Sequence, residues 1–118
     1  MSLDVNVRDD NGVSVIDISG RLTLGEGATK LRDDIRELVA EGKKRILLNL
    51  AGLTYMDSSG MGLLVGAYAT VSREGGHLKL ANLNSRIKDL LLITKLYAVF
   101  EIYEDEAAAL GSFAVLTG

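Results

Sequence analysis

The chain has 118 residues, 47% of them hydrophobic and 25% charged, a composition that predicts one globular domain over residues 1–118 with a single core. A net charge of −3, 5% aromatic residues and no basic run longer than Lys43-Lys44-Arg45 exclude the usual features of a nucleic-acid-binding protein. The chain has no cysteine, no signal peptide and no apolar run near the roughly 18 residues that cross a bilayer, so we expect a cytoplasmic protein without disulfides.

Residues 3–42 predict a β-hairpin followed by a helix. Apolar residues alternate with polar ones over residues 3–7 and again over residues 13–18. Asn11-Gly12 lies between the two runs, and an Asn-Gly pair in this position is the strongest short hairpin signal. After Gly20 the apolar residues recur at helical spacing until Gly42, which predicts a helix of about four turns.

The rest of the chain predicts alternating strands and helices. Residues 45–50 are almost continuously apolar, which favours a central strand buried on both faces. Further elements are expected in this order: a helix at Ser58–Arg73, a strand at His77–Ala81, a helix capped by Asn84 or Ser85, a strand at 99–103 and a helix at 104–116. This order predicts an α/β fold, in which about four helices cover a mixed β-sheet of about five strands with parallel crossovers.

The segment with the most candidate functional side chains joins the central strand to the next helix. Asp57, Ser58 and Ser59 begin that helix, where polar side chains accept hydrogen bonds from free backbone amides. A cap needs only Asp57 or Ser58, so two adjacent hydroxyls exceed the requirement. Three glycines follow, each costing about 1 kcal/mol relative to alanine in a helix: Gly60, Gly62 and Gly66. Their presence indicates close approach of the backbone, either to the sheet beneath or to a partner above.

The sequence around these serines resembles the signature of the STAS family, the sulfate transporter and anti-sigma factor antagonist domains. Asp57-Ser58-Ser59-Gly60 carries the resemblance, with Leu48-Asn49-Leu50 before it and Met61-Gly62-Leu63-Leu64 after it. Ile18-Ser19-Gly20-Arg21-Leu22 is similar to the Gly-x-Leu element of the family, and Leu78-Lys79-Leu80-Ala81-Asn82-Leu83 to its penultimate strand. The resemblance therefore covers nearly the whole chain.

Two positions depart from the family pattern. Thr23 stands where many kinase-regulated members have an aspartate after the Gly-x-Leu element. Thr94-Lys95-Leu96 stands where the usual sequence is Thr-Gly-Leu. The resemblance places residue 23 near the phosphorylation site, whereas the change at Lys95 is interpreted as a loop adjustment.

The resemblance implies a non-enzymatic regulator that exchanges partners. Ser58, with Ser59 as the second candidate, would accept phosphate from an anti-sigma factor that is itself a serine protein kinase. The unphosphorylated chain would bind this anti-sigma factor and release sigma, phosphorylation would end the binding, and a serine phosphatase would restore it. Such a protein needs no cofactor or metal, contacts no membrane, and is expected to be a monomer or a weak dimer.

A partner-binding surface is expected around the phosphorylation site. The polar and glycine residues of the motif are assigned to it together with neighbouring apolar side chains and Thr23: Met56, Asp57, Ser58, Ser59, Gly60, Met61 and Leu64. The apolar members support a second interpretation, because Met and Leu at helical spacing are typical core residues.

Three alternative functions are open from the sequence. A hydrolase using Ser58 or Ser59 needs a base, but the only histidine is His77 and the Gly-x-Ser-x-Gly nucleophile motif is missing. An acidic set near the C-terminus offers a cation site or a solvated helix start: Glu101, Glu104, Asp105 and Glu106. A STAS subunit held permanently in a lipid-transport or stress-sensing complex would use the same fold with Ser58 unmodified.

Overall fold

The chain begins with an antiparallel hairpin in the computed structural model, which describes residues 3–115. β1 (Leu3–Asp10) pairs with β2 (Val13–Leu22) from Leu3 opposite Gly20 to Asp10 opposite Val13. Asn11 and Gly12 form the turn with φ values of 51° and 86°, the left-handed backbone that a two-residue hairpin turn requires. The predicted hairpin is therefore confirmed.

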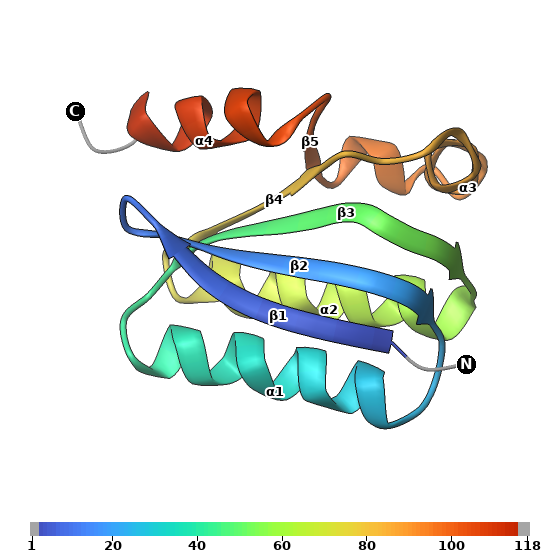
Figure 1. The fold of residues 1–118 in the computed structure, drawn as a ribbon, viewed down its shortest axis with the longest axis horizontal. Coiled ribbons are helices and arrows are strands. Elements are labelled where there is room, and N and C mark those ends of the chain that lie inside the picture. The colour runs from blue at the N-terminus through green and yellow to red at the C-terminus, as the bar shows by residue number, and fades with distance from the viewer. Residues whose placement is uncertain (1–2, 116–118) are drawn as a thin grey trace.

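Two strand–helix–strand units build the centre of the molecule. α1 (Glu26–Ala40) connects β2 to β3 (Arg45–Met56), and α2 (Ser58–Arg73) connects β3 to β4 (His77–Ala81). β2, β3 and β4 are parallel, and the five strands follow one another in the order β1-β2-β3-β4-β5. α1 and α2 lie side by side on one face of the sheet, as Figure 1 shows.

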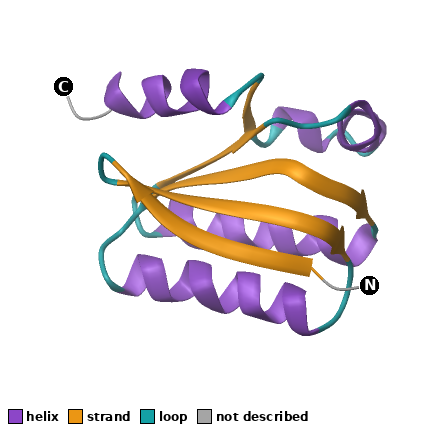
Figure 2. Cartoon of the chain, viewed as in Figure 1, coloured by secondary structure: helices purple, strands orange, loops and turns teal. Residues whose placement is uncertain are grey.

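The last third of the chain completes the sheet and covers its other face. α3 (Ser85–Ile93) and a short 3₁₀ turn, η1 (Leu96–Ala98), lead to β5 (Glu101–Tyr103) and α4 (Glu106–Val115), as Figure 2 shows. α4 lies on the face opposite α1 and α2. A mixed five-stranded sheet with four α-helices confirms the predicted fold class.

Three element boundaries differ from the prediction, and one of them is the start of α4, which lies at Glu106 rather than at Glu104. β3 continues to Met56, where a loop was expected after Leu50, because the long β2 pairs with it as far as Met56, with shifts in register. β5 begins at Glu101 rather than at Val99, because η1 occupies the preceding residues. Lys95 enters that turn with φ of 64°, at the position where the family pattern has glycine. The expected end of the last helix at Leu116 lies outside the described residues.

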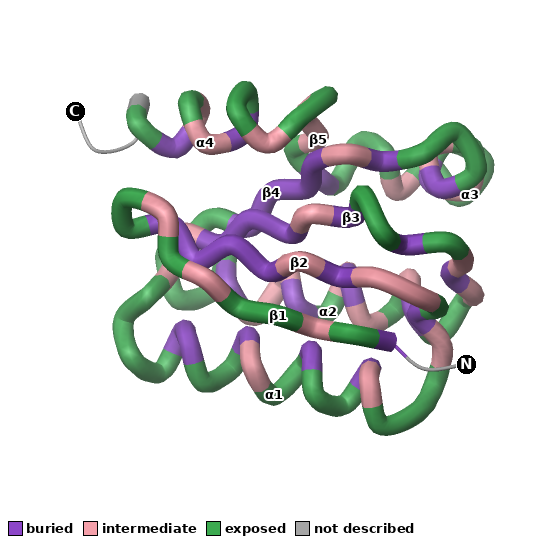
Figure 3. Tube along the Cα trace, viewed as in Figure 1, coloured by how far each residue is buried: buried purple, intermediate pink, exposed green. Residues whose placement is uncertain are grey.

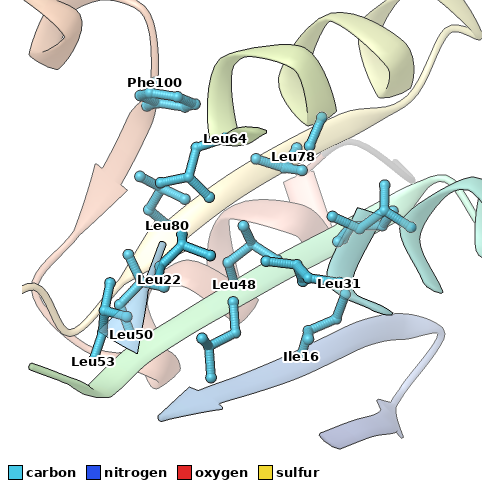
Figure 4. Close-up of a cluster of buried hydrophobic side chains, with 14 of the residues drawn as sticks. Ile16, Leu22, Leu31, Leu48, Leu50, Leu53, Leu64, Leu78, Leu80 and Phe100 are labelled. Carbon is cyan, nitrogen blue, oxygen red and sulfur yellow. The ribbon is translucent and has the colours of Figure 1, made fainter. Parts of the chain in front are cut away.

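The sheet separates two hydrophobic clusters. Figure 3 shows that many positions of β2, β3 and β4 are buried. The larger cluster, part of which Figure 4 shows, lies between the sheet and α1 and α2. α3 contributes Ile87 and Leu91 to it. The smaller cluster lies beneath α4, where Ala109 and Phe113 pack on Leu47. β3 therefore contributes to both clusters, which confirms that it is a central strand buried on both faces. Between residues 3 and 115, no helix combines the length and apolarity required to cross a bilayer.

A polar network on the α4 side ties β1, β2, β3 and α4 together. Arg8 Nε donates to Asp17 Oδ2 over 2.7 Å, and a second nitrogen of Arg8 donates to Glu106 of α4 over 2.5 Å. Asn49 of β3 donates to the other oxygen of Asp17 over 2.8 Å. The hydrogen bond from Arg8, followed by that from Asn49, holds the pKa of Asp17 below its ordinary value of 3.8 despite partial burial.

This network predicts a pH-dependent contribution to stability. Because the pKa of Asp17 is lower in the folded chain, its stabilisation is complete above the unfolded value near 3.8 and disappears as pH falls through the folded pKa. Asp17→Asn is expected to lose about 1 kcal/mol at pH 7, since the carboxylate is one-third exposed, and progressively less below pH 4. Urea unfolding from pH 6 to pH 2.5 measures this difference. Asp9→Asn, which replaces an exposed carboxylate on the neighbouring strand β1, should retain the wild-type pH profile. A free energy of unfolding that depends on pH in Asp17→Asn as it does in wild type would contradict the prediction.

Candidate functional site

The start of α2 has a single side-chain cap, provided by Asp57. Asp57 Oδ1 accepts the Gly60 N–H over 2.9 Å, and the Asp57 carbonyl accepts the Met61 N–H over 3.0 Å. Its extended backbone, with φ of −105° and ψ of −172°, is typical of a residue that caps a helix. Asp57 therefore fulfils the structural role that the sequence left open between Asp57 and Ser58.

Ser58 and Ser59 are consequently free for another role. Both side chains are exposed in the first turn of α2, and neither hydroxyl has a hydrogen-bond partner among residues 3–115. Their backbone N–H groups are also unpaired within the same residues, as expected in the first helical turn. The site thus places two free hydroxyls at the positive end of a helix, beside one carboxylate.

The ends of β2 and β3 hold α2 in place through Gly60. A Cβ atom at position 60 would collide with the Leu22 carbonyl oxygen and would lie 2.9 Å from the Cγ atoms of Leu22 and Met56. The Asp57 N–H also donates to the Leu22 carbonyl over 3.4 Å. Gly60 is therefore required by the sheet beneath. Thr23, which is half-buried, directly follows Leu22 in the chain.

Two residues expected on the partner-binding surface are core residues instead. Met56 is 4% exposed and Leu64 is fully buried, because both side chains point from β3 and α2 into the larger cluster (Figure 4 shows Leu64). Met61 is half-buried and remains partly available at the surface. The sequence interpretation also missed Leu24, which is 86% exposed in the loop after Thr23. An isolated leucine between two polar or glycine residues was the only signal that could have identified it.

The structure does not bring Ser58 and His77 together. His77 begins β4 opposite Arg45, at the amino end of the parallel strands, whereas Ser58 follows the carboxyl end of β3. The 16 residues of α2, about 24 Å of helix, run between the two ends. A histidine at that distance cannot accept the proton of either serine hydroxyl, so His77 is not the base of a hydrolase at this site.

The acidic residues near the C-terminus make separate contacts. Glu101 lies 3.5 Å from Lys79, Glu104 lies 3.6 Å from Lys88, and Asp105 accepts the Ala108 N–H over 2.8 Å at the start of α4. Glu106 belongs to the network with Arg8. Among residues 3–115, no three histidine, cysteine or acidic side chains are grouped as metal ligands.

Comparisons with known proteins agree with the architecture of this site. Residues 4–109 match the family model described as the STAS domain. The anti-sigma-B factor antagonist of Bacillus subtilis is 32% identical over 102 residues, which cover 86% of this chain and 92% of that protein. The crystal structure of an anti-sigma factor antagonist from Mycobacterium paratuberculosis superposes with a TM-score of 0.80 and 24% identity, covering 94% and 93% of the two chains. The Bacillus cell fate determinant SpoIIAA in its phosphorylated form superposes with a TM-score of 0.70 and 22% identity, covering 89% and 96%.

Proposed function

Because the chain belongs to the STAS domain family, we propose that it is an anti-sigma factor antagonist whose binding is controlled by phosphorylation of Ser58. The proposal rests on the different roles of Asp57 and Ser58 at the start of α2. Asp57 caps the helix, so the exposed Ser58 hydroxyl is free to accept a phosphoryl group without loss of the cap. Ser59 is the second candidate acceptor, being equally exposed.

The unphosphorylated chain would bind an anti-sigma factor that is a serine protein kinase. The polar part of the contact surface is formed by Ser58, Ser59 and Thr23, and Met61 and Leu24 provide its apolar part. Binding of the anti-sigma factor would release the sigma factor that it holds. Since the chain provides only the acceptor hydroxyl, the kinase supplies the chemistry.

Phosphorylation of Ser58 would then end this complex. A phosphoserine adds a charge of about −1.5 to −2 directly beside Asp57, at a surface that has to be desolvated on binding. The free amides at the start of α2 favour an anion there, so the fold itself remains intact. The SpoIIAA structure supports this step, since a protein of the same fold has been solved in a phosphorylated form. A serine phosphatase would restore the binding form.

The test uses purified anti-sigma factors with a serine kinase domain from the organism that encodes this chain. Each is mixed with the chain and ATP, and intact mass and peptide mapping locate the phosphate. Titration calorimetry without ATP then compares wild type with Ser58→Ala and Ser58→Asp. We expect one phosphate on Ser58, none on Ser58→Ala, and an affinity at least about tenfold lower for Ser58→Asp.

Ser85→Asp is the matched control for the added charge. Ser85 is an exposed serine in the same position of α3, directly after the capping residue Asn84. We expect it to leave the affinity unchanged. The phosphorylation switch would be refuted if no kinase modified the chain and if Ser58→Asp bound the anti-sigma factor with the same affinity as wild type. A constitutive subunit of a larger complex would then be the better description.

A further inference from the structure

A groove separates α1 and α2 on the surface and starts at the candidate phosphorylation site. Its volume is about 470 Å³, and Ser59 and Leu24 lie at one end. Leu63 of α2, which is half-buried, contributes to its apolar lining, and the core residue Ile35 of α1 lies beneath it with only 1% of its surface exposed. The groove is therefore continuous with the surface that carries Ser58.

The groove is lined by arginines and by no acidic residue of the described chain. Arg32 and Arg36 border it from α1, and Arg73 borders it from α2. Arg32 lies 3.6 Å from the neighbouring Asp33, but neither Arg36 nor Arg73 forms an ion pair within residues 3–115. These positive charges are concentrated on one surface of a chain whose net charge is −3.

Charge is also segregated around α1 itself. Its acidic residues Asp34 and Glu37 border a different hollow, next to Val5 of β1. Arg32 and Arg36 are four residues apart and therefore lie on one side of the helix, roughly 6 Å from each other. The arginines of α1 thus border the groove, whereas Asp34 and Glu37 border the other hollow, and the charge of Arg36 is available to a partner.

Two glycines of α2 have no structural explanation among residues 3–115. Gly62 and Gly66 are exposed and border the groove, and a Cβ atom at either position would meet no atom within 4 Å. Glycine is a poor helix former, so alanine would suit both positions better if only folding mattered. Gly60 is required by the sheet, whereas no contact among residues 3–115 requires glycine at positions 62 and 66.

We propose that this groove docks an acidic amphipathic helix of the anti-sigma factor. The inference rests on the proposed function, because it takes the anti-sigma factor as the protein that supplies the helix. Carboxylates on the two sides of that helix would pair with the guanidinium groups of Arg32 and Arg36 and of Arg73. The apolar stripe of the helix would lie on Leu24 and Leu63, and its backbone would approach α2 closely at the glycines. The groove and the Ser58 surface then form one continuous interface.

The test measures binding of the purified anti-sigma factor kinase to charge-reversed variants of the full chain. Arg36→Glu is expected to lower the affinity by about tenfold and to weaken its dependence on salt. Lys30→Glu makes the same charge change on α1 outside the groove, where Lys30 pairs with Asp34, and should bind like wild type. Equal affinities for Arg36→Glu and wild type would overturn the proposal.

A second variant separates binding from folding. Gly66→Leu fills the groove at a position where the added side chain meets open space, so its thermal midpoint should equal or exceed that of wild type. Its affinity is nevertheless expected to fall by about tenfold or more. Wild-type affinity with the groove filled in this way would also overturn the proposal.

Cross-linking identifies the segment that docks. Because the chain contains no cysteine, Ala69→Cys carries a single photoreactive label in the groove, and Ala107→Cys carries it on α4 as the control. We expect Ala69→Cys alone to label an acidic helical segment of the kinase, and labelling of a basic or extended segment would refute the proposal. If the wild-type chain binds no such kinase, the proposed function fails and the docking proposal fails with it. If the wild-type chain binds the kinase and the groove variants bind it with the same affinity, the docking proposal alone is refuted.

Discussion

Gly60→Ala is expected to lower the free energy of unfolding by about 2 to 3 kcal/mol, although alanine is the better helix former. The added methyl group would collide with the Leu22 carbonyl oxygen, which is backbone and cannot move without disturbing the pairing of β2 with β3. It would also lie 2.9 Å from the Cγ atoms of Leu22 and Met56 in the core. Relief of these contacts requires α2 to move away from the sheet, which exposes part of the larger cluster.

Gly66→Ala is the matched control on the same helix. It adds the same methyl group where no atom lies within 4 Å, so only helix propensity acts and the stability should rise by up to about 1 kcal/mol. Urea unfolding followed by circular dichroism gives both values. A gain in stability for Gly60→Ala would show that the start of α2 is not held against β2 as described.

Leu64→Ala is expected to cost about 3 to 4 kcal/mol. Leu64 is fully buried in the larger cluster between α2 and the sheet, and Figure 4 shows it near Leu80 and Phe100. Truncation removes the apolar contacts of the side chain and leaves a cavity that surrounding β-strands cannot easily fill. The result distinguishes a core role for Leu64 from the surface role that the sequence left open.

Met61→Ala provides the comparison one turn earlier on α2. Met61 is half-buried and packs only against the margin of the cluster, so its truncation should cost about 1 kcal/mol or less. Thermal and urea unfolding of the two variants measure the difference. Equal losses for Leu64→Ala and Met61→Ala would contradict the assigned burial.

Local patterns were sufficient to predict most of the fold. The Asn11-Gly12 turn, the helical spacing that ends at Gly42 and the apolar run of β3 each depend on residues close together in the sequence. These patterns specify element type, and their order specifies a mixed sheet with parallel crossovers. The boundaries of β3 and β5 were wrong because strand ends depend on the length of the neighbouring strand and on intervening turns.

The sequence by itself also located the candidate site, since Asp57, Ser58 and Ser59 stand together at a helix start. Only the tertiary structure decided that Asp57 is the cap, that Gly60 lies against β2, and that Leu64 is buried. The α1–α2 groove likewise required the packed structure, because Arg36 and Arg73 come from helices separated by a whole strand. Periodicity reports which face of one element is apolar. Which surfaces of two elements meet depends on packing between residues distant in sequence, and no local pattern contains that information.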